Sequence, residues 1–232
     1  MKLEKVTKRS GTTTKRWYDD ACGTALAMEL VGERWALLIV RELMFGARRF
    51  GELKASLTGI SANVLTQRLE GLEKAHILKR RKLPPPANVQ VYELTSWGYQ
   101  AEDAIKVLGA WAARSPEHDR TLPLSAASMM LSLRTMIDAE KARALPPMTV
   151  GFAFGPESFV ARLADGALPI VRGEGETDAH FATTARFMAN IVYGKWPIEA
   201  AEAEGALVFI GDRDKARAFI DLFALPPKAE VE

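Results

Sequence analysis

The sequence predicts an α+β protein in two parts: a helical part that closes with a β-hairpin, and a smaller part that mixes helices and strands. Apolar residues recur at helical spacing over four segments before residue 75. Two strand-like segments then flank the stretch PPPAN, which is too proline-rich to be helical. Residues 114–123, RSPEHDRTLP, are polar and bounded by proline, so we divide the chain into residues 1–118 and 119–232.

Four helices are expected before residue 75. The first opens near Asp19, because acidic groups stabilise the positive end of a helix, and its apolar stripe runs through Cys22, Leu26 and Leu30. The segments ERWALLIVRELMFG and RRFGELKASL predict the second and third helices. Ser61 is a typical N-cap for a fourth helix over residues 61–74.

The fourth helix has two distinct faces. Its apolar stripe consists of Leu65, Leu69 and Leu72. Asn63 and Gln67 point to the opposite side, given the helical period of 3.6 residues. The segments ILKRRKL and VQVYELT follow as a hairpin whose first strand carries the basic residues 79–82, and a long helix is expected over about Ser96–Arg114.

The second part predicts an α+β domain. A helix is expected over about Leu124–Ala144, and strands at MTVGFAFG, SFVARLAD, ALPIVRG, AHFAT and ALVFIGD. Further helices are expected at about Ala185–Tyr193, after Pro197, and at RDKARAFIDLF. No repeat of 20–50 residues is present, which excludes a solenoid or a propeller.

The first part therefore predicts a winged helix-turn-helix, in which the fourth helix enters the major groove of double-stranded DNA. Outward amide and hydroxyl groups can pair with base edges, while the basic strand neutralises phosphates and makes binding salt-dependent. The predicted DNA contacts are Ser61, Asn63, Thr66, Gln67, Arg68, Lys79, Arg80, Arg81, Lys82, Asn88 and Gln90. The alternatives are that Asn63 and Gln67 are ordinary surface residues, and that Arg68, closer to the stripe, braces the fold.

Composition and charge predict a soluble, cytoplasmic protein without membrane contact. Hydrophobic residues make up 48% and charged residues 26% of the chain, and no apolar run is long enough to span a bilayer. Residues 1–118 hold 19 Lys and Arg against 13 Asp and Glu, whereas residues 119–232 hold 12 against 16. This difference suggests that only the first part meets a polyanion, although chance is the alternative. Residues 1–17 are basic and without hydrophobic periodicity, and they predict a flexible arm rather than a secretory signal.

Residues 18–112 resemble the HxlR-type transcriptional regulators. The matching motifs are GERW, LLIVREL, RRFGEL, GISANVLTQRL, LEKAHILKR, the proline-rich wing and YELTSWG. The resemblance implies a homodimeric bacterial regulator that binds an inverted-repeat operator, with the first helix and the Ser96–Arg114 helix as the dimer surface. The expected interface residues are Leu26, Trp97, Ile105, Leu108 and Trp111. A helix packed on the protein's own core explains the same stripe.

Cys22, the single cysteine, excludes an intrachain disulfide and suits a reducing compartment. In the resembled family a cysteine near the start of the first helix often senses oxidants or electrophiles. A helix N-terminus favours the thiolate, but Asp19 and Asp20 oppose it. The stripe geometry turns the sulfur inward, which favours a structural cysteine over a sensor.

The second part resembles the sterol-carrier-protein-like fold that follows some regulators of this type. The motif that carries the resemblance is a helix ending at Gly194, then PIEA, then ALVFIGD and a helix. It implies a hydrophobic cavity for an apolar small-molecule effector. The expected lining residues are Phe152, Phe154, Phe187, Met188, Ile191 and Trp196. The alternatives are that these residues are plain core and that the domain serves only for assembly.

The sequence predicts no enzyme, cofactor or metal site. The histidines, His76, His118 and His180, are scattered, and no Ser-His-Asp order, phosphate loop or metal-ligand spacing is present. We expect a dimeric, sequence-specific transcriptional regulator that acts as a repressor. A small-molecule carrier or adaptor whose winged helix binds a protein is one alternative, and a non-specific DNA-compacting protein is another.

Overall fold

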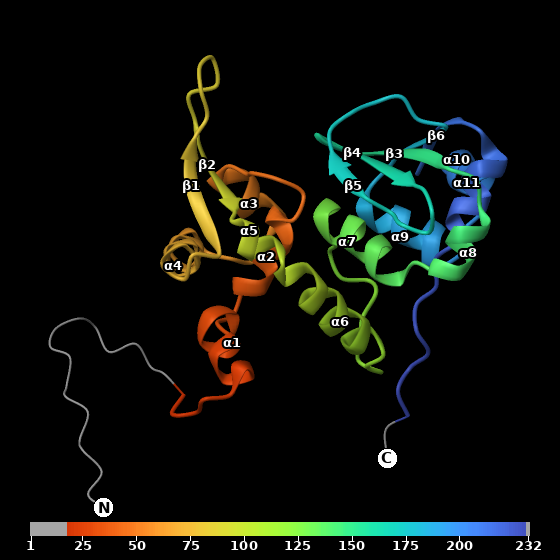
Figure 1. Ribbon diagram of the computed structural model, residues 1–232. Helices are drawn as coiled ribbons and strands as arrows, with labels where there is room; N and C mark the ends of the chain where they lie inside the picture. The colour runs from red at the N-terminus through yellow and green to blue at the C-terminus, as the bar shows by residue number, and fades with distance from the viewer. Residues whose placement is uncertain (1–17, 231–232) are drawn as a thin grey trace, which may run out of the picture.

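The computed structural model describes residues 18–230, so the predicted arm at residues 1–17 lies outside the described residues. The N-terminal half, which ends at residue 118, has the following elements (Figure 1): α1 (Gly23–Val31), α2 (Ala36–Leu43), α3 (Phe50–Ser56), α4 (Ala62–Lys74), β1 (Leu78–Lys82), β2 (Gln90–Leu94), α5 (Ser96–Tyr99) and α6 (Ala101–Ala113). This order of helices followed by a hairpin is the winged helix-turn-helix that the sequence predicts.

Local sequence signals explain how these elements form. The Ser61 hydroxyl accepts a hydrogen bond from the backbone N–H of Val64 at 3.2 Å and so begins α4, as predicted. The leucine stripe of α4 is buried against α2, whose Ile39 and Leu43 are also fully buried. Strands β1 and β2 pair antiparallel from Leu78 opposite Leu94 to Lys82 opposite Gln90.

The C-terminal half forms a five-stranded sheet with helices. Its elements are α7 (Ala126–Met136), α8 (Ala139–Ala144), β3 (Met148–Phe154), β4 (Glu157–Leu163), β5 (Ile170–Arg172), β6 (Ala179–Ala182), α9 (Ala185–Tyr193), α10 (Ile198–Ala203), β7 (Val208–Gly211) and α11 (Arg213–Ile220). The strand order is β5-β4-β3-β6-β7, in which only β3 and β6 are parallel neighbours. All five strand segments expected in this half are present.

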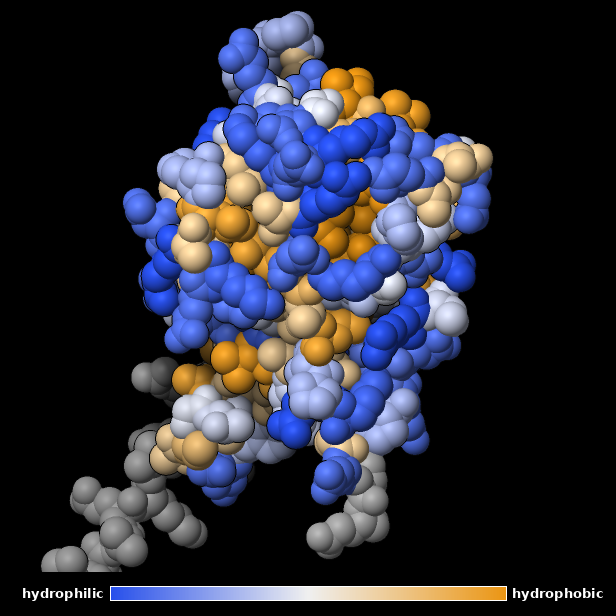
Figure 2. Space-filling model, turned by 90° about the vertical axis from the view of Figure 1, so that its right-hand side faces the viewer, coloured by the Kyte–Doolittle hydropathy of each residue, from blue (hydrophilic) through white to orange (hydrophobic). Residues whose placement is uncertain are grey.

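The two faces of this sheet differ. Phe152 and Phe181 point into the core, where Phe152 meets Phe219 of α11 with ring centroids 6.0 Å apart. On the opposite face, Val208 and Ile210 of β7 are exposed. Figure 2 views the molecule from the side of the C-terminal half and shows apolar surface in several separate areas among hydrophilic residues.

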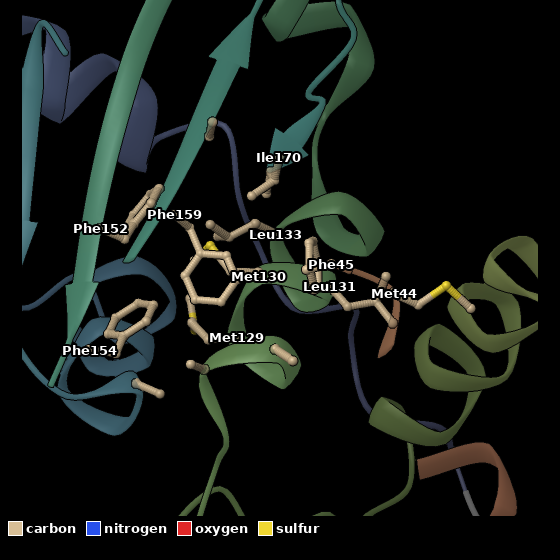
Figure 3. Close-up of a cluster of buried hydrophobic side chains, with 14 of the residues drawn as sticks. Met44, Phe45, Met129, Met130, Leu131, Leu133, Phe152, Phe154, Phe159 and Ile170 are labelled. Carbon is tan, nitrogen blue, oxygen red and sulfur yellow. The ribbon is translucent and has the colours of Figure 1, made fainter. Parts of the chain in front are cut away.

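The hydrophobic core crosses from one half to the other. Met44 and Phe45, which follow α2, lie beside the buried methionines and leucines of α7 (Figure 3). The ring of Phe45 meets that of Phe159 in β4 edge-on, with centroids 5.6 Å apart. The guanidinium of Arg134 lies 4.8 Å from the Phe45 ring centroid. The two halves therefore share packed side chains at α2, α7 and β4.

Three predicted helix boundaries were wrong. The first helix begins at Gly23 rather than near Asp19, because the Asp20 carboxylate accepts from the N–H of Cys22 while Cys22 is still extended. The predicted Ser96–Arg114 helix is divided at Gln100 into α5 and α6. The predicted Leu124–Ala144 helix is divided into α7 and α8, because Ile137 is extended and Asp138 caps a new helix.

No helix within residues 18–230 combines the length and the apolar character needed to cross a membrane.

Candidate nucleic-acid interface

The outer face of α4 carries polar side chains. Asn63, Thr66 and Gln67 are exposed, whereas the leucine stripe on the opposite side is buried. The hydroxyl oxygen of Ser61 is engaged as a cap acceptor, which leaves its proton free to donate. Amides and hydroxyls held on the outside of a packed helix can form hydrogen bonds with base edges in a major groove.

Arg68 braces α4 against the loop that precedes α2. Its Nε donates to the backbone oxygen of Arg34 at 3.0 Å, and its Nη2 lies 2.9 Å from Glu33. This is the bracing role that the sequence analysis gave as the alternative to a DNA contact. These contacts hold α4 in a fixed orientation relative to the loop before α2.

The wing lies beside α4 and carries the basic block on β1 (Figure 1). Three of its four cations already have acidic partners, a feature the sequence analysis did not anticipate. Arg80 pairs with Glu73 of α4 at 2.6 Å, while Arg81 and Lys79 share Glu93 at 3.0 and 3.7 Å. The hydrogen bond to Glu73 raises the pKa of Arg80 above its ordinary value.

Lys82 forms no ion pair within the part of the chain that the structure describes. At the wing tip, Asn88 is exposed with a left-handed φ of 43°, a conformation that asparagine tolerates. Gln90 donates to the hydroxyl of Tyr92 at 3.3 Å. The side-chain polar atoms of Lys82 and Asn88 are therefore free for a partner, whereas Gln90 is engaged in the hairpin.

The predicted dimer surface is apolar and exposed. The exposed fractions of Trp97 and Trp111 are 51% and 72%, and Leu26 and Leu108 are also exposed, while Ile105 is half-buried. Ile105 packs against the core, so the two interpretations divide the stripe: its inner side packs on the protein itself, while Trp97, Leu108 and Trp111 stay exposed. Val107 of α6 is also exposed and extends this surface, although it is absent from the predicted interface. Val107 lies one helical turn before Trp111, so its spacing was a usable signal.

Cys22 is exposed, so the expectation that its sulfur turns inward was wrong. Helix α1 has no fully buried residue: Leu30 of its stripe packs partly against the core, whereas Leu26 is exposed. Hydrogen bonds from the backbone N–H and the hydroxyl of Thr24, and then from the N–H of Ala25, lower the pKa of the Cys22 thiol.

The six predicted pocket residues do not form one cavity wall. Phe152, Met188 and Ile191 are fully buried in the core, and Phe187 meets Trp196 edge-on at 5.9 Å. Of the six, Phe154 borders a cleft of about 1320 Å³ at the junction of the two halves. No local sequence pattern predicts this cleft, because its walls come from segments that are far apart in the chain.

A polar group at the junction was also missed. Glu42 of α2 is fully buried and accepts hydrogen bonds from Arg41 at 2.8 Å and from the hydroxyl of Ser125 at 2.6 Å. Arg48, nearly buried, donates to Glu157 of β4 at 3.0 Å. Glu42 lies three residues after the buried Ile39, so helical spacing alone places it on the buried face.

A polar-faced helix beside a cationic hairpin defines the class of winged helix-turn-helix proteins. Residues 30–120 match the HxlR-like helix-turn-helix family. The HTH-type transcriptional regulator YodB of Bacillus subtilis is 36% identical over 86 residues, which cover 37% of this chain and 77% of YodB. The chain therefore belongs to the HxlR-like helix-turn-helix family.

Other relatives match over a similar fraction of this chain. An uncharacterised HTH-type transcriptional regulator of Mycobacterium tuberculosis is 44% identical over 85 residues, or 37% of this chain. The chain spans 53% of the length of that relative. The solved structure of reduced YodB is 33% identical and covers 43% of this chain and 99% of YodB, with a TM-score of 0.39.

A sec-alkylsulfatase, Pisa1 from a Pseudomonas species, is 22% identical and covers 47% of this chain and 18% of the sulfatase, with a TM-score of 0.41. At these TM-scores neither structural likeness supports an assignment of function.

Proposed function

We propose that the protein is a sequence-specific DNA-binding transcriptional regulator, in which α4 enters the major groove and the β1–β2 wing contacts the phosphate backbone. The observation that carries the proposal is the exposed set of Asn63, Thr66 and Gln67 directly beside the cationic strand β1. Base-edge contacts from α4 specify sequence, while Lys82 and the paired cations of β1 supply the electrostatic part of binding. Membership of the HxlR-like family supports this proposal.

The regulator acts as a homodimer on an inverted repeat. The exposed tryptophans and aliphatic residues of α1, α5 and α6 support this, because a soluble chain rarely leaves so many large apolar side chains in water. A two-fold dimer presents two copies of α4 to half-sites about one helical turn apart. We also propose that the protein works in the cytoplasm, where the chromosome lies, and that it has no catalytic activity.

The regulator represses transcription until a signal releases it. Exposure of Cys22 and the lowered pKa of its thiol support reaction with oxidants or electrophiles at the start of α1. The C-terminal half, from residue 119, is the sterol-carrier-like domain that receives an effector. The mixed sheet with helices on one face supports that comparison, and the cavity at its junction with the N-terminal half supports the effector.

Selection of bound sequences from a random DNA pool at physiological salt tests the proposal. Enrichment of an inverted repeat is expected, with discrimination against non-specific DNA of about 4–10 kcal/mol. Binding with a steep salt dependence but no enriched sequence would indicate a DNA-compacting protein. A folded, reduced protein that binds no DNA would move the assignment to an adaptor whose winged helix binds a protein.

A further inference from the structure

Helix α6 has two sides with different surroundings. Val107, Leu108 and Trp111 are exposed on one side, which belongs to the proposed dimer surface. On its other side α6 packs against α7 of the C-terminal half and against α2, which itself contacts the proposed recognition helix α4 (Figure 1). The position of α6 within one protomer therefore sets how the dimer surface is oriented relative to α4.

The start of α6 is bound by one guanidinium of the C-terminal half. Nη1 of Arg134, on α7, donates to both carboxylate oxygens of Glu102, in the first turn of α6, at 2.9 Å each. Nη2 of Arg134 donates to the backbone oxygen of Ile170 in β5 at 2.6 Å, and the guanidinium lies over the Phe45 ring. Both side chains of the ion pair are partly buried, where water screens charges less than at the surface. Arg134 thus joins α6 to the sheet of the C-terminal half.

The end of α6 is bound by the C-terminal tail, residues 224–230. A helix ends in backbone oxygens that have no partner inside the helix and that carry partial negative charge. The ammonium of Lys228 donates to the backbone oxygen of Ser115 at 2.6 Å. The N–H of Ala229 donates to the backbone oxygen of Arg114 at 2.8 Å. The cap of α6 therefore comes from a lysine 113 positions beyond Ser115.

The tail is itself fixed to the C-terminal half. Phe223, just before it, is buried and meets Phe219 of α11 with ring centroids 4.9 Å apart. Pro226 and Pro227 follow, and the ring of each proline fixes its φ, so the stretch between Phe223 and Lys228 has few conformations available. The tail therefore ties the end of α6 to the core of the C-terminal half.

We infer that the C-terminal half positions the dimer helix α6 and so sets the spacing between the two half-sites that the dimer recognises. Arg134 and Lys228 are the positioning residues, and their contacts, here called the α6 clamp, lie about 16–20 Å apart along the helix. This role rests on the proposed function, in which α6 belongs to the dimer surface and α4 reads DNA. It adds to that function a part for the C-terminal half in the geometry of DNA recognition.

The spacing of half-sites is sensitive to the position of α6. One extra base pair moves a half-site by about 3.4 Å and turns it by about a tenth of a helical turn. A dimer that holds its two α4 helices rigidly therefore meets both half-sites at one spacing. If α6 can shift, the second α4 reaches half-sites at several spacings at a smaller cost. Loss of the clamp should broaden the choice of spacing and leave the base sequence of each half-site unchanged.

The test is binding of the full chain to its selected operator and to versions with the spacer lengthened or shortened by single base pairs. The natural chain should bind at least about tenfold more weakly one base pair away from its preferred spacing. Glu102→Ala and Lys228→Met together should reduce this difference to about threefold or less. Glu102 is changed rather than Arg134, because Arg134 also binds Ile170. An unchanged spacing preference in the doubly substituted protein would overturn the positioning role.

Matched substitutions on α8 are the controls. Lys141 is exposed and pairs with Asp138 at the start of its own helix, so Lys141→Met removes the same charge as Lys228→Met without touching the clamp. Glu140→Ala, also exposed, is the control for Glu102→Ala. Both controls should keep the natural spacing preference. Lys228→Arg should keep it too, because a guanidinium can donate to the same backbone oxygens. Equal broadening by the α8 controls would show an effect of charge and would contradict the clamp.

Amide hydrogen exchange of the full chain without DNA measures the clamp itself. Lys228 is exposed, so Lys228→Met should fold like the natural chain. Without the cap the last turn of α6 should open more often, and its amides at residues 111–115 should exchange about two- to fivefold faster. Lys228→Arg should restore the natural rate. Unchanged exchange in Lys228→Met would show that the tail does not hold the helix and would contradict the clamp.

These measurements separate the clamp from the proposed function. If the natural chain selects an operator but the substituted proteins keep its spacing preference, the positioning role is wrong and the regulator stands. If the chain selects no DNA, the proposed function fails and the role in spacing fails with it. Hydrogen exchange then still decides whether the C-terminal half holds α6.

Discussion

The N-terminal half meets its surroundings through two charged regions that differ in solvent exposure. On the wing, the side chains of Lys79, Arg80 and Arg81 are 58%, 40% and 44% exposed. Their acidic partners, Glu73 and Glu93, are partly exposed. At the junction, the side chains of Glu42 and Arg48 are 0% and 6% exposed. The same residue types therefore form ion pairs in nearly opposite environments.

This difference separates charges that can change partners from charges that cannot. An exposed ion pair contributes little to stability because water and salt screen it, so DNA phosphates can replace Glu93 at small cost. A buried carboxylate that loses a hydrogen-bonding partner has no water to replace it. We infer that the wing can exchange ion pairs on binding DNA, while the junction holds the two halves in a fixed geometry.

The largest expected effect is on stability at the junction. Glu42→Ala leaves Arg41 and Arg48 without their buried carboxylate and should lower the free energy of unfolding by about 3–5 kcal/mol. Glu93→Ala on the wing removes a carboxylate with the same number of basic neighbours and should lower it by less than about 1 kcal/mol. Urea unfolding of both variants measures the difference. Equal losses would show that burial does not distinguish the two regions.

The next effect concerns base recognition by α4. Gln67→Ala should reduce discrimination among operator variants by about 1–3 kcal/mol at one base pair, because an exposed amide is removed without disturbing the leucine stripe. Equilibrium binding to the selected operator and to its single-base variants measures it. Asn190→Ala removes an exposed amide from α9 and is the control. A uniform loss of affinity at every base would contradict base readout by Gln67.

The sequence predicted the wing region well because its signals are local. Ser61 caps the helix that starts beside it, and Leu65 and Leu69 lie on one face through the helical period alone. The two strands follow from segments that are separated by only a short proline-rich loop. Such signals act over a few residues, so the order of helices and strands, and the polar face of α4, could be predicted.

The junction could not be predicted because its partners are far apart in the chain. Ser125 donates to Glu42 across 83 positions, and Arg48 donates to Glu157 across 109 positions. No period or spacing links such residues. The error at Cys22 has a related cause: an apolar stripe predicts burial only where a core lies opposite it, and the core meets Leu30 and Val31 at the end of α1 but not Cys22 at its start.

A smaller effect, on DNA affinity, is expected from a change at Glu93, the carboxylate that Lys79 and Arg81 share. Glu93→Gln removes that carboxylate, so more positive charge faces the phosphates and DNA affinity should rise about twofold on specific and non-specific sequences alike. Filter or anisotropy binding at two salt concentrations measures it. Glu140→Gln, on the exposed start of α8, adds the same charge far from the wing and should have little effect. A fall in affinity would show that Glu93 orients the cations for DNA.

The smallest expected effect on folding comes from Cys22, which is exposed at the start of a helix without buried residues. Cys22→Ser should leave the midpoint of urea unfolding unchanged, since no packed group is lost. The thiol itself should be reactive. Hydrogen bonds from Thr24 lower its pKa, so the thiolate persists to lower pH than in an ordinary cysteine, and the rate of alkylation should rise through a midpoint below that of a free thiol. Thr24→Ala should move this midpoint upward. A midpoint at the ordinary value in both proteins would remove the physical basis for a sensor at this position, and the exposed stripe of α1 would then have assembly as its single proposed role.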